Sequence, residues 1–534
     1  MRVRTLMFAT LLAAMAPLGA AAQNASAIVA GASKAMGVDN LNSITYSGTA
    51  RNGSFGQSKS IGDPMGPVNV TQITQYTRTI NFGQSSDPMT LVSRATGPTQ
   101  PPTVPGAPPP MPGVFNQNIT GMQATTSWAQ ALNIWTTPWG FLKGAAANNA
   151  AVRQQNGQQV VSFSPPNLKS PSGQMYTVTG YINNQNLVTK VETRVEHAVV
   201  GDLLVEFDYS NYQSMNGVQV PTKMTQRQAG LTTFDANITS ATPNASNLTA
   251  LLTPPPTPAR GGAPPAGAPP AGGGGAAPAP AGQGGRGPAG AAAPAVPPAG
   301  GAPQAAGGGQ PPAGPPPVDK LGDGAFRIGG NYTSLAIDMG DHVLVVESGQ
   351  SDARGLAVMA AAKQAIPNKP IRFVVNSHPH FDHASGLAAA AAEGATILTH
   401  RNNEEVLERL LAGPRTLTDD SLSKVASRRS NVVEGVGDRE VRRGNNGRVV
   451  ELHRIPNEHS DGMLAVYLPA EKVLWTADIT AVNPNAGQLG IVKALVEATD
   501  RLKLDYNIFI PAHPPNPDQP LTKADVAKAA TATP

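Results

Sequence analysis

The amino-acid sequence predicts two folded modules of different class, a mainly antiparallel β module and an α/β module, joined by a disordered linker. Three observations carry this prediction: alternating polar and apolar runs in the N-terminal part, a Pro/Gly/Ala tract after it, and strands alternating with helices towards the C-terminus. A chain of 534 residues is also too long for a single hydrophobic core. We therefore expect residues 24–253, 254–318 and 319–534 to be the β module, the linker and the α/β module, respectively.

Residues 1–22 have the composition of a secretory signal peptide. Arg2 and Arg4 provide a basic start, residues 6–20 are apolar, and Ala20–Ala22 offers small residues for cleavage. The apolar stretch is short for a bilayer span, and no later stretch suggests a membrane segment. The chain has no cysteine, which excludes disulfides and lipidation of a signal-peptide cysteine. We expect a soluble periplasmic or secreted protein with no integral membrane segment after signal cleavage.

The N-terminal module is polar and rich in strand signals. Runs of alternating apolar and polar residues are separated by short turns, a pattern typical of an antiparallel meander. These runs are 176–182, 187–196, 202–212, 218–228 and 232–241, and a helical segment at 24–37 precedes them. The layout resembles the periplasmic outer-membrane lipoprotein carrier fold, a curved sheet with a helix in its concavity. His197 stands alone in a strand pattern, so we expect it to be structural or exposed rather than a ligand.

Residues 254–318 consist largely of Pro, Gly and Ala. They lack apolar periodicity and cannot bury a core, so we expect them to be disordered. With such a linker between them, the two modules need not be rigidly docked.

In the C-terminal module, strand-like and helix-like segments alternate, which is typical of an α/β fold. Residues 333–348 predict two strands joined by a Gly-Asp turn, and 352–366 predict an amphipathic helix with an Asp near its start. A buried strand at 371–377 and a helix at 382–395 follow. The remaining segments are a strand at 396–400, a helix at 402–413, and strands at 448–455, 463–469, 472–478 and 506–513.

Four polar side chains, His378, His380, Asp382 and His383, lie within six residues directly after the buried strand 371–377. His378 and His380 are two residues apart in an extended segment, so both can point to one side. Asp382 and His383 begin the next helix and can point to a second spot nearby. The arrangement predicts two neighbouring cations, and imidazole and carboxylate ligands suit Zn²⁺, with Fe or Mn as possible alternatives.

Further ligands must come from distant positions, and three residues qualify. His459 follows a predicted strand, while Asp478 and His513 end two others. Each terminates an apolar run, which is where sheet folds place their chemistry.

The segments "HPHFDH", "HSDG", "TAD" and "AH", in this order, resemble the metallo-β-lactamase superfamily over roughly residues 319–520. The resemblance implies an αβ/βα sandwich, with two facing mixed sheets and helices outside. It implies that His378, His380 and His459 bind one metal and that Asp382, His383 and His513 bind a second. Asp478 would bridge the two metals.

Some features separate this sequence from parts of that superfamily. The branch with a zinc-bound cysteine is ruled out because the chain has no cysteine, and Asp478 points away from the narrow β-lactamase branches, which usually lack it. Glu347 stands where the family often has Asp, and a role behind the metal ligands is expected for it. Ser377 and Asp461 are expected to fix imidazole tautomers, because each is adjacent to a ligand.

These features predict an exported dinuclear zinc hydrolase. Two cations that share a water lower its pKa, and the resulting hydroxide attacks an ester, lactone, thioester or amide carbonyl of a small molecule. Asp382 is the expected catalytic residue, because it can orient the nucleophile and pass on a proton.

Two other classes of protein are alternatives. The N-terminal sheet could bind a lipid or another apolar ligand, with the metal module as an accessory. The other alternative is a redox enzyme of the di-iron branch of the same superfamily. That branch typically has a carboxylate in place of one histidine of the cluster and carries a flavin domain, and neither feature is present in this sequence. A net charge of +4 is mild for this length and argues against a nucleic-acid partner, and the oligomeric state is left open.

Overall fold

The computed structural model describes residues 18–67, 70–82, 90–96, 99–100, 114–120, 134–166, 168–252, 315–427, 429–479, 481–482, 484, 486–515 and 518–532. The expected linker at 254–318 lies outside these residues except for its last four positions, and most of the expected signal peptide lies outside them as well. Among the described residues, we find no helix that combines the length and the apolar character needed to cross a membrane.

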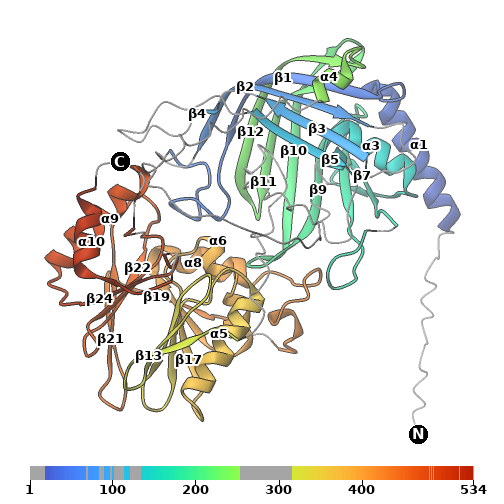
Figure 1. Ribbon diagram of the computed structural model, residues 1–534. Coiled ribbons are helices and arrows are strands. Elements are labelled where there is room, and N and C mark those ends of the chain that lie inside the picture. Colours follow the sequence, from blue (N-terminus) through green and yellow to red (C-terminus); the bar gives the residue numbers. More distant parts are fainter. Residues whose placement is uncertain are drawn as a thin grey trace, which may run out of the picture.

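A large antiparallel sheet forms the N-terminal module (Figure 1). Its main path has the order β5-β3-β2-β1-β12-β11-β10-β9-β8-β7-β6, and β4 pairs with β2 at the side. The strands are β1 (Ser43–Asn52), β2 (Thr71–Asn81), β3 (Thr90–Thr96), β4 (Thr99–Gln100), β5 (Val114–Thr120), β6 (Ala151–Gln155), β7 (Gln158–Phe163), β8 (Val178–Ile182), β9 (Val188–His197), β10 (Gly201–Met215), β11 (Val218–Gln228) and β12 (Leu231–Pro243). The meander from β8 to β12 confirms the predicted antiparallel module, whereas the likeness to a carrier fold stays a prediction.

Two helices, α1 (Leu18–Met36) and α3 (Pro138–Ala147), contact each other and cover part of this sheet. The fully buried Trp139 of α3 donates its indole N–H to the carbonyl of Gln219, 3.0 Å away. A short helix, α4 (Leu248–Leu252), follows the last strand. The predicted helix at 24–37 corresponds to α1, which starts earlier in the sequence.

Two sheets form the C-terminal module. The first has the order β13-β14-β15-β16-β17-β18-β19 and is parallel from β16 to β19, and the second has the order β20-β21-β22-β23-β24-β25. Their strands are β13 (Val318–Gly322), β14 (Ala325–Ile328), β15 (Ser334–Asp338), β16 (Val343–Val346), β17 (Ile371–Val375), β18 (Thr396–His400), β19 (Val433–Val436), β20 (Arg439–Arg443), β21 (Val449–Arg454), β22 (Leu464–Leu468), β23 (Val473–Thr476), β24 (Ile508–Pro511) and β25 (Leu521–Thr522).

Alternation along the strands explains why the sheets face each other. In β16, Leu344 and Val346 enter a core shared with the second sheet, whereas Val343 and Val345 face the helices on the outside. In β22, Val466 enters the shared core. The outer helices are α5 (Asp352–Ala365), α7 (Leu387–Ala392) and α8 (Arg401–Leu411) on the first sheet, and α9 (Ala486–Arg501) and α10 (Lys523–Ala530) on the second. This layering confirms the expected αβ/βα sandwich.

The single helix predicted at 382–395 is wrong, because the chain forms two short helices there, α6 (Phe381–Ala384) and α7. The break falls at Gly386, whose N–H donates to the carbonyl of Gly349 at 2.9 Å. A Cβ at position 386 would lie 2.4 Å from the carbonyl oxygen of Ser348. The backbone therefore needs glycine at this close approach, and the helix is interrupted so that this contact can form.

The two modules are packed together along one edge (Figure 1). One hydrophobic cluster runs from the helices of the N-terminal module to α5, α7 and α8 of the C-terminal module. Asp202, at the start of β10, accepts hydrogen bonds from the backbone N–H groups of Thr416 and Leu417 at 3.0 and 2.8 Å. The buried guanidinium of Arg415 donates to the carbonyl of Ala198 at 3.1 Å. Both polar and apolar contacts therefore join the modules.

His197 belongs to this interface. Its side chain is buried, its ring packs edge-on against Phe381 with 4.5 Å between centroids, and its Nδ1 accepts the N–H groups of Val199 and Val200 at 3.2 Å. Burial, and then the charge of Arg415, lower the pKa of His197 to about 3. It is therefore a neutral structural residue, in line with the expectation from the sequence.

Because His197 is buried and neutral, the stability of the folded protein depends on pH. As the pH falls below 6.5, the unfolded chain binds a proton at His197 that the folded protein does not bind until about pH 3, so stability is lost across this window. At pH 4.5 the loss from this residue is about 3 kcal/mol. Urea titrations of His197→Asn, which keeps a hydrogen-bond acceptor near the position of Nδ1, test this. Between pH 7 and pH 4.5, we expect the free energy of unfolding of this variant to fall by about 3 kcal/mol less than that of wild type. Equal losses in both proteins would contradict the assignment.

Candidate metal centre

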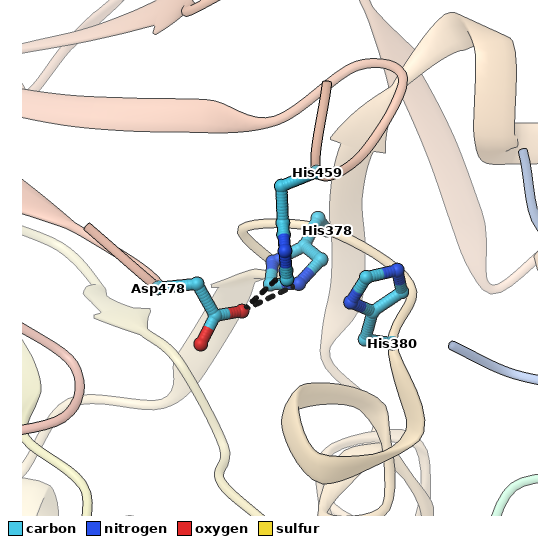
Figure 2. A group of neighbouring side chains, drawn as sticks. All are labelled: His378, His380, His459 and Asp478. Atoms are coloured by element: carbon cyan, nitrogen blue, oxygen red, sulfur yellow. Dashed lines mark hydrogen bonds and ion pairs between the residues drawn. The ribbon is translucent and has the colours of Figure 1, made fainter. Parts of the chain in front are cut away.

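Two groups of four side chains converge at one edge of the C-terminal module, and they share Asp478. In each group, one nitrogen or oxygen of every member lies within 4.8 Å of the corresponding atoms of the others. Figure 2 shows the first group. The first comprises His378, His380, His459 and Asp478, and the second comprises Asp382, His383, Asp478 and His513. The structure thus brings together all seven residues that the sequence singled out.

Strand ends position these residues. His378 and His380 lie on the loop between β17 and α6, and Asp382 and His383 lie in α6 itself. The other members come from the second sheet. His459 lies on the loop between β21 and β22, Asp478 follows β23, and His513 follows β24. The facing sheets therefore bring together segments that are 76 to 135 residues apart in the sequence.

Asp478 is the centre of the arrangement. Its Oδ2 lies 2.9 Å from His378 Nε2, 3.0 Å from His459 Nε2 and 3.0 Å from His383 Nε2. Its Oδ1 lies 2.5 Å from His513 Nε2. One carboxylate oxygen thus faces members of both groups, as expected of a ligand that two cations share.

Glu347 and Ser377 lie directly behind the ligands. Glu347 is fully buried, and its Oε2 accepts the Ser377 hydroxyl at 2.7 Å and lies 3.3 Å from His383 Nδ1. The Ser377 hydroxyl has one hydrogen, which it donates to Glu347, so it accepts from His378 Nδ1 at 3.2 Å. His378 and His383 are thereby protonated on Nδ1, and Nε2 of each is the nitrogen that faces the cluster.

The backbone is strained at two of these positions. Glu347 and Asp478 have φ angles of +67° and +50°, which non-glycine residues adopt rarely and at a cost. Both residues lie just beyond a strand, after β16 and β23, where the chain must turn sharply to aim the carboxylate at the histidines. Strain of this kind is typical of functional sites.

Burial keeps His378 and His380 neutral, whereas Asp478 and Glu347 outweigh burial and raise the pKa of His383 well above its usual range. Burial, and then the neighbouring His383, lower the pKa of His378 to about 4, and burial also lowers the pKa of His380. Burial would raise the pKa of Asp478, but the charge of the adjacent His383 holds it well below its usual range. Neutral imidazoles and an anionic carboxylate are the forms that bind metals.

The donor set fits metal ions by an independent test. Nε2 of His378 and Nδ1 of His380 are buried and have no hydrogen-bond partner, although both face the cluster. A buried polar atom without a partner is costly, and a cation at this place would satisfy both. Mixed imidazole and carboxylate ligands suit a divalent metal such as zinc.

Tyr332 is a site residue that the sequence analysis missed. Its hydroxyl donates to Asp382 Oδ2 at 3.2 Å, and its ring lies 4.5 Å from the His513 ring between centroids. Burial and the nearby Asp382 carboxylate raise the pKa of Tyr332, so the phenol remains a donor near neutral pH. The buried Arg354 holds the Tyr332 backbone by donating to its carbonyl at 2.6 Å. Tyr332 precedes β15 without any motif, so no sequence signal marks it.

The expectations for Ser377 and Asp461 have mixed outcomes. Ser377 contacts His378 as expected. Asp461 instead uses its backbone: its N–H donates to the carbonyl of Lys59 at 2.7 Å, and its carbonyl accepts from Asn403 at 3.0 Å. His400 caps helix α8, where its ring accepts the N–H of Asn402 at 3.3 Å, so its role is structural.

Comparison with known proteins was consistent with this geometry. Residues 327–513 match the family model of the metallo-beta-lactamase superfamily. The alpha subunit of 2,4-dinitroanisole O-demethylase from Nocardioides sp. (strain JS1661) is 26% identical over 194 residues. That match covers 36% of this chain and 53% of the subunit, so the chain spans about half the length of this relative.

Solved structures also show similarity to part of this chain. A metallo-beta-lactamase from Hirschia baltica is 21% identical with a TM-score of 0.31, and the match covers 41% of this chain and 97% of that one. The stereoselective inverting sec-alkylsulfatase Pisa1 from Pseudomonas sp. is 17% identical with a TM-score of 0.30, covering 40% of this chain and 41% of that one.

Proposed function

We propose, from a C-terminal module that belongs to the metallo-β-lactamase superfamily, that this protein is an exported dinuclear zinc hydrolase of small molecules. The observation that carries the proposal is the convergence of two ligand groups on Asp478. His378, His380 and His459 would hold one cation, and Asp382, His383 and His513 would hold the other. Bound cations supply Lewis acidity, which acidifies water and polarises the carbonyl oxygen under attack.

Asp382 is the residue proposed to handle the proton. Its Oδ2 faces the second ligand group, 3.3 Å from His383 Nε2, and it receives the Tyr332 hydroxyl. Burial would raise the pKa of Asp382, but His383 and the hydrogen bond from Gln57 hold it far below its usual range. The ionised carboxylate can orient a water through Oδ2, and because so low a pKa makes it a weak base, it would pass on at once any proton that it receives.

The substrate class is proposed as an ester, lactone, thioester or amide. The side chains of His459 and His513 are 27% and 35% exposed, whereas those of His378 and His383 are fully buried, so a substrate would approach from the side of His459 and His513. The named O-demethylase subunit suggests adding an activated aryl methyl ether to the substrates tested.

The experiment is metal analysis of the purified full-length protein, followed by assays with nitrocefin, a lactone, a thioester, a p-nitrophenyl ester and 2,4-dinitroanisole. We expect about two equivalents of zinc and turnover that a chelator abolishes and added zinc restores. A properly folded protein that binds no zinc in titration would refute the proposal. If 2,4-dinitroanisole is the only compound turned over, the proposed metal centre stands, but the proposed carbonyl substrates are wrong.

A tyrosine variant tests the role of Asp382. In Tyr332→Phe the carboxylate loses one donor, and we expect kcat to fall about 10- to 100-fold, the range for contacts that support a metal-site residue. The zinc content should stay at about two equivalents, because Tyr332 belongs to neither ligand group. Tyr467→Phe, which removes a hydroxyl bonded to the Asp505 carbonyl, is the control and should retain wild-type kcat. Equal rates in Tyr332→Phe and wild type would remove Tyr332 from the mechanism.

Export is proposed from the first residues of the sequence. The basic start, the apolar stretch and Ala20–Ala22 support cleavage before Gln23, and the lack of cysteine is compatible with an oxidising compartment. N-terminal sequencing of the protein recovered outside the cytoplasm should begin at Gln23. A cytoplasmic protein that retains Met1 would contradict this.

Ligand capture by the N-terminal sheet receives less support. The cavity between Tyr46, Tyr76, Tyr209 and Phe234 holds about 20 Å³, which is room for about one water molecule. A lipid tail would need this cavity to open. A larger hollow of about 460 Å³ beside β6 and β7 is lined largely by short polar side chains such as Asn148, Ser162 and Thr177, which do not suit a lipid tail. The metal centre therefore remains the better basis for function.

A further inference from the structure

The segment 53–66, which is part of the loop between β1 and β2, leaves the N-terminal sheet and reaches the metal centre (Figure 1). We call it the docking loop. Its Gly56 carbonyl accepts the N–H of Phe381 at 2.9 Å, and its Lys59 carbonyl accepts the N–H of Asp461 at 2.7 Å. We infer that the docking loop is a functional part of the metal centre and positions His380 and Asp382, so that the N-terminal module completes the site.

Ser58 contacts the first ligand group through its backbone. Its carbonyl oxygen lies 3.0 Å from Nε2 of His380, and both residues are buried. A carbonyl only accepts hydrogen bonds, so Nε2 carries the proton and Nδ1 keeps its lone pair. That Nδ1 is the buried atom without a partner that faces the cluster. Ser58 therefore selects the tautomer in which His380 can bind a cation.

Gln57 contacts the second ligand group through its side chain. Its Nε2 donates to Oδ1 of Asp382 at 2.7 Å. The other oxygen, Oδ2, lies 3.3 Å from His383 Nε2 and 3.7 Å from His513 Nε2. Gln57 thus fixes the rotation of the carboxylate, so that one oxygen remains with the ligands.

The docking loop is seated by packing as well as by these hydrogen bonds. The ring of Phe55 meets Phe381 edge-on with 5.0 Å between centroids, and Ile61 is buried. Gly56 has a φ of +74°, and a Cβ there would lie 2.0 Å from the Phe381 ring. Only glycine therefore allows this approach of the docking loop to the residue next to His380. The ion pair of Lys59 with the exposed Glu458, at 2.8 Å, adds little by comparison.

This inference rests on the proposed function, and zinc affinity tests it in the full-length protein. Three variants are compared with wild type by competition against a chromophoric chelator: Gly56→Ala, which displaces the docking loop, Gln57→Ala, which removes one contact, and Ser60→Ala. Ser60 has an exposed side chain in the same loop and is the matched control. Circular dichroism and urea unfolding of the metal-free proteins report on folding independently.

We expect Gly56→Ala to bind zinc about 10- to 100-fold more weakly than wild type, which is the range for contacts behind metal ligands. Gln57→Ala should bind one of the two zinc ions about 10-fold more weakly. Ser60→Ala should bind as wild type does. Wild-type zinc affinity in both Gly56→Ala and Gln57→Ala would overturn the inference and leave the proposed function standing, whereas a wild type that binds no zinc would refute the function itself. Should Gly56→Ala not fold, Gln57→Ala decides alone, because its side chain is exposed.

Discussion

Replacement of Asp478 by alanine is expected to remove zinc from both ligand groups at once. Its carboxylate faces His378, His459, His383 and His513 at 2.5–3.0 Å, so neither group keeps its shared ligand. Bound zinc should fall from about two equivalents to below one. Activity should fall by more than the roughly 100-fold that is the upper range for residues behind the ligands. Metal analysis after dialysis and kcat/KM on the best substrate measure the two effects.

The control for this variant is Asp505→Ala. Asp505 is an exposed carboxylate in the same module that pairs with Lys472 at 2.8 Å, and its removal should leave zinc content and activity unchanged. Asp478→Ala protein that still binds two equivalents of zinc would mean that Asp478 is not a shared ligand. Circular dichroism shows whether Asp478→Ala has lost secondary structure. If it has, both measurements are repeated on Asp478→Asn, which keeps the shape of the side chain, so that loss of metal can be told apart from loss of folding.

Replacement of Arg415 by alanine is expected to give the largest loss of stability at the interface between the modules. Its side chain is 1% exposed, pairs with the buried Asp420 at 2.5 Å, and donates to the carbonyl groups of Ala198 and Val199 in the N-terminal module. Removing one partner leaves the other charge buried and uncompensated, which costs about 3–5 kcal/mol. The midpoint of urea unfolding, followed by tryptophan fluorescence and by circular dichroism, should fall accordingly.

Two further variants show whether the loss of stability in Arg415→Ala comes from breaking a buried ion pair or from removing a charged side chain in general. Lys424→Ala breaks the pair of Lys424 with Asp419, in which both side chains are more than 60% exposed, and should change stability by less than about 1 kcal/mol. Arg415→Ala/Asp420→Ala removes both charges and should be less destabilised than Arg415→Ala. A double variant at least as unstable as the single one would show that the uncompensated charge is not the cause.

Much of the C-terminal module follows from local patterns in the sequence. The continuous apolar runs of β16 and β22 indicate strands that are buried on both faces, and the polar residues His459, Asp478 and His513 stand out because each follows an apolar run. Spacing alone brings His378, His380, Asp382 and His383 together, since strand β17 ends just before them. The helix at 382–395 was predicted as one element because its alanine-rich sequence favours a helix, and only the approach of Gly386 to the Ser348 carbonyl divides it.

The sequence by itself determined which side chains could bind a metal, because imidazole and carboxylate chemistry is a property of the residue and strand ends are visible in hydrophobic patterns. The tertiary structure alone decided what surrounds them. Ser58 acts through a carbonyl that every residue possesses, Gln57 through an ordinary surface amide, and Tyr332 through a hydroxyl next to no motif. Their effects arise from contacts across about 50 to more than 300 residues of sequence, which local periodicity does not encode.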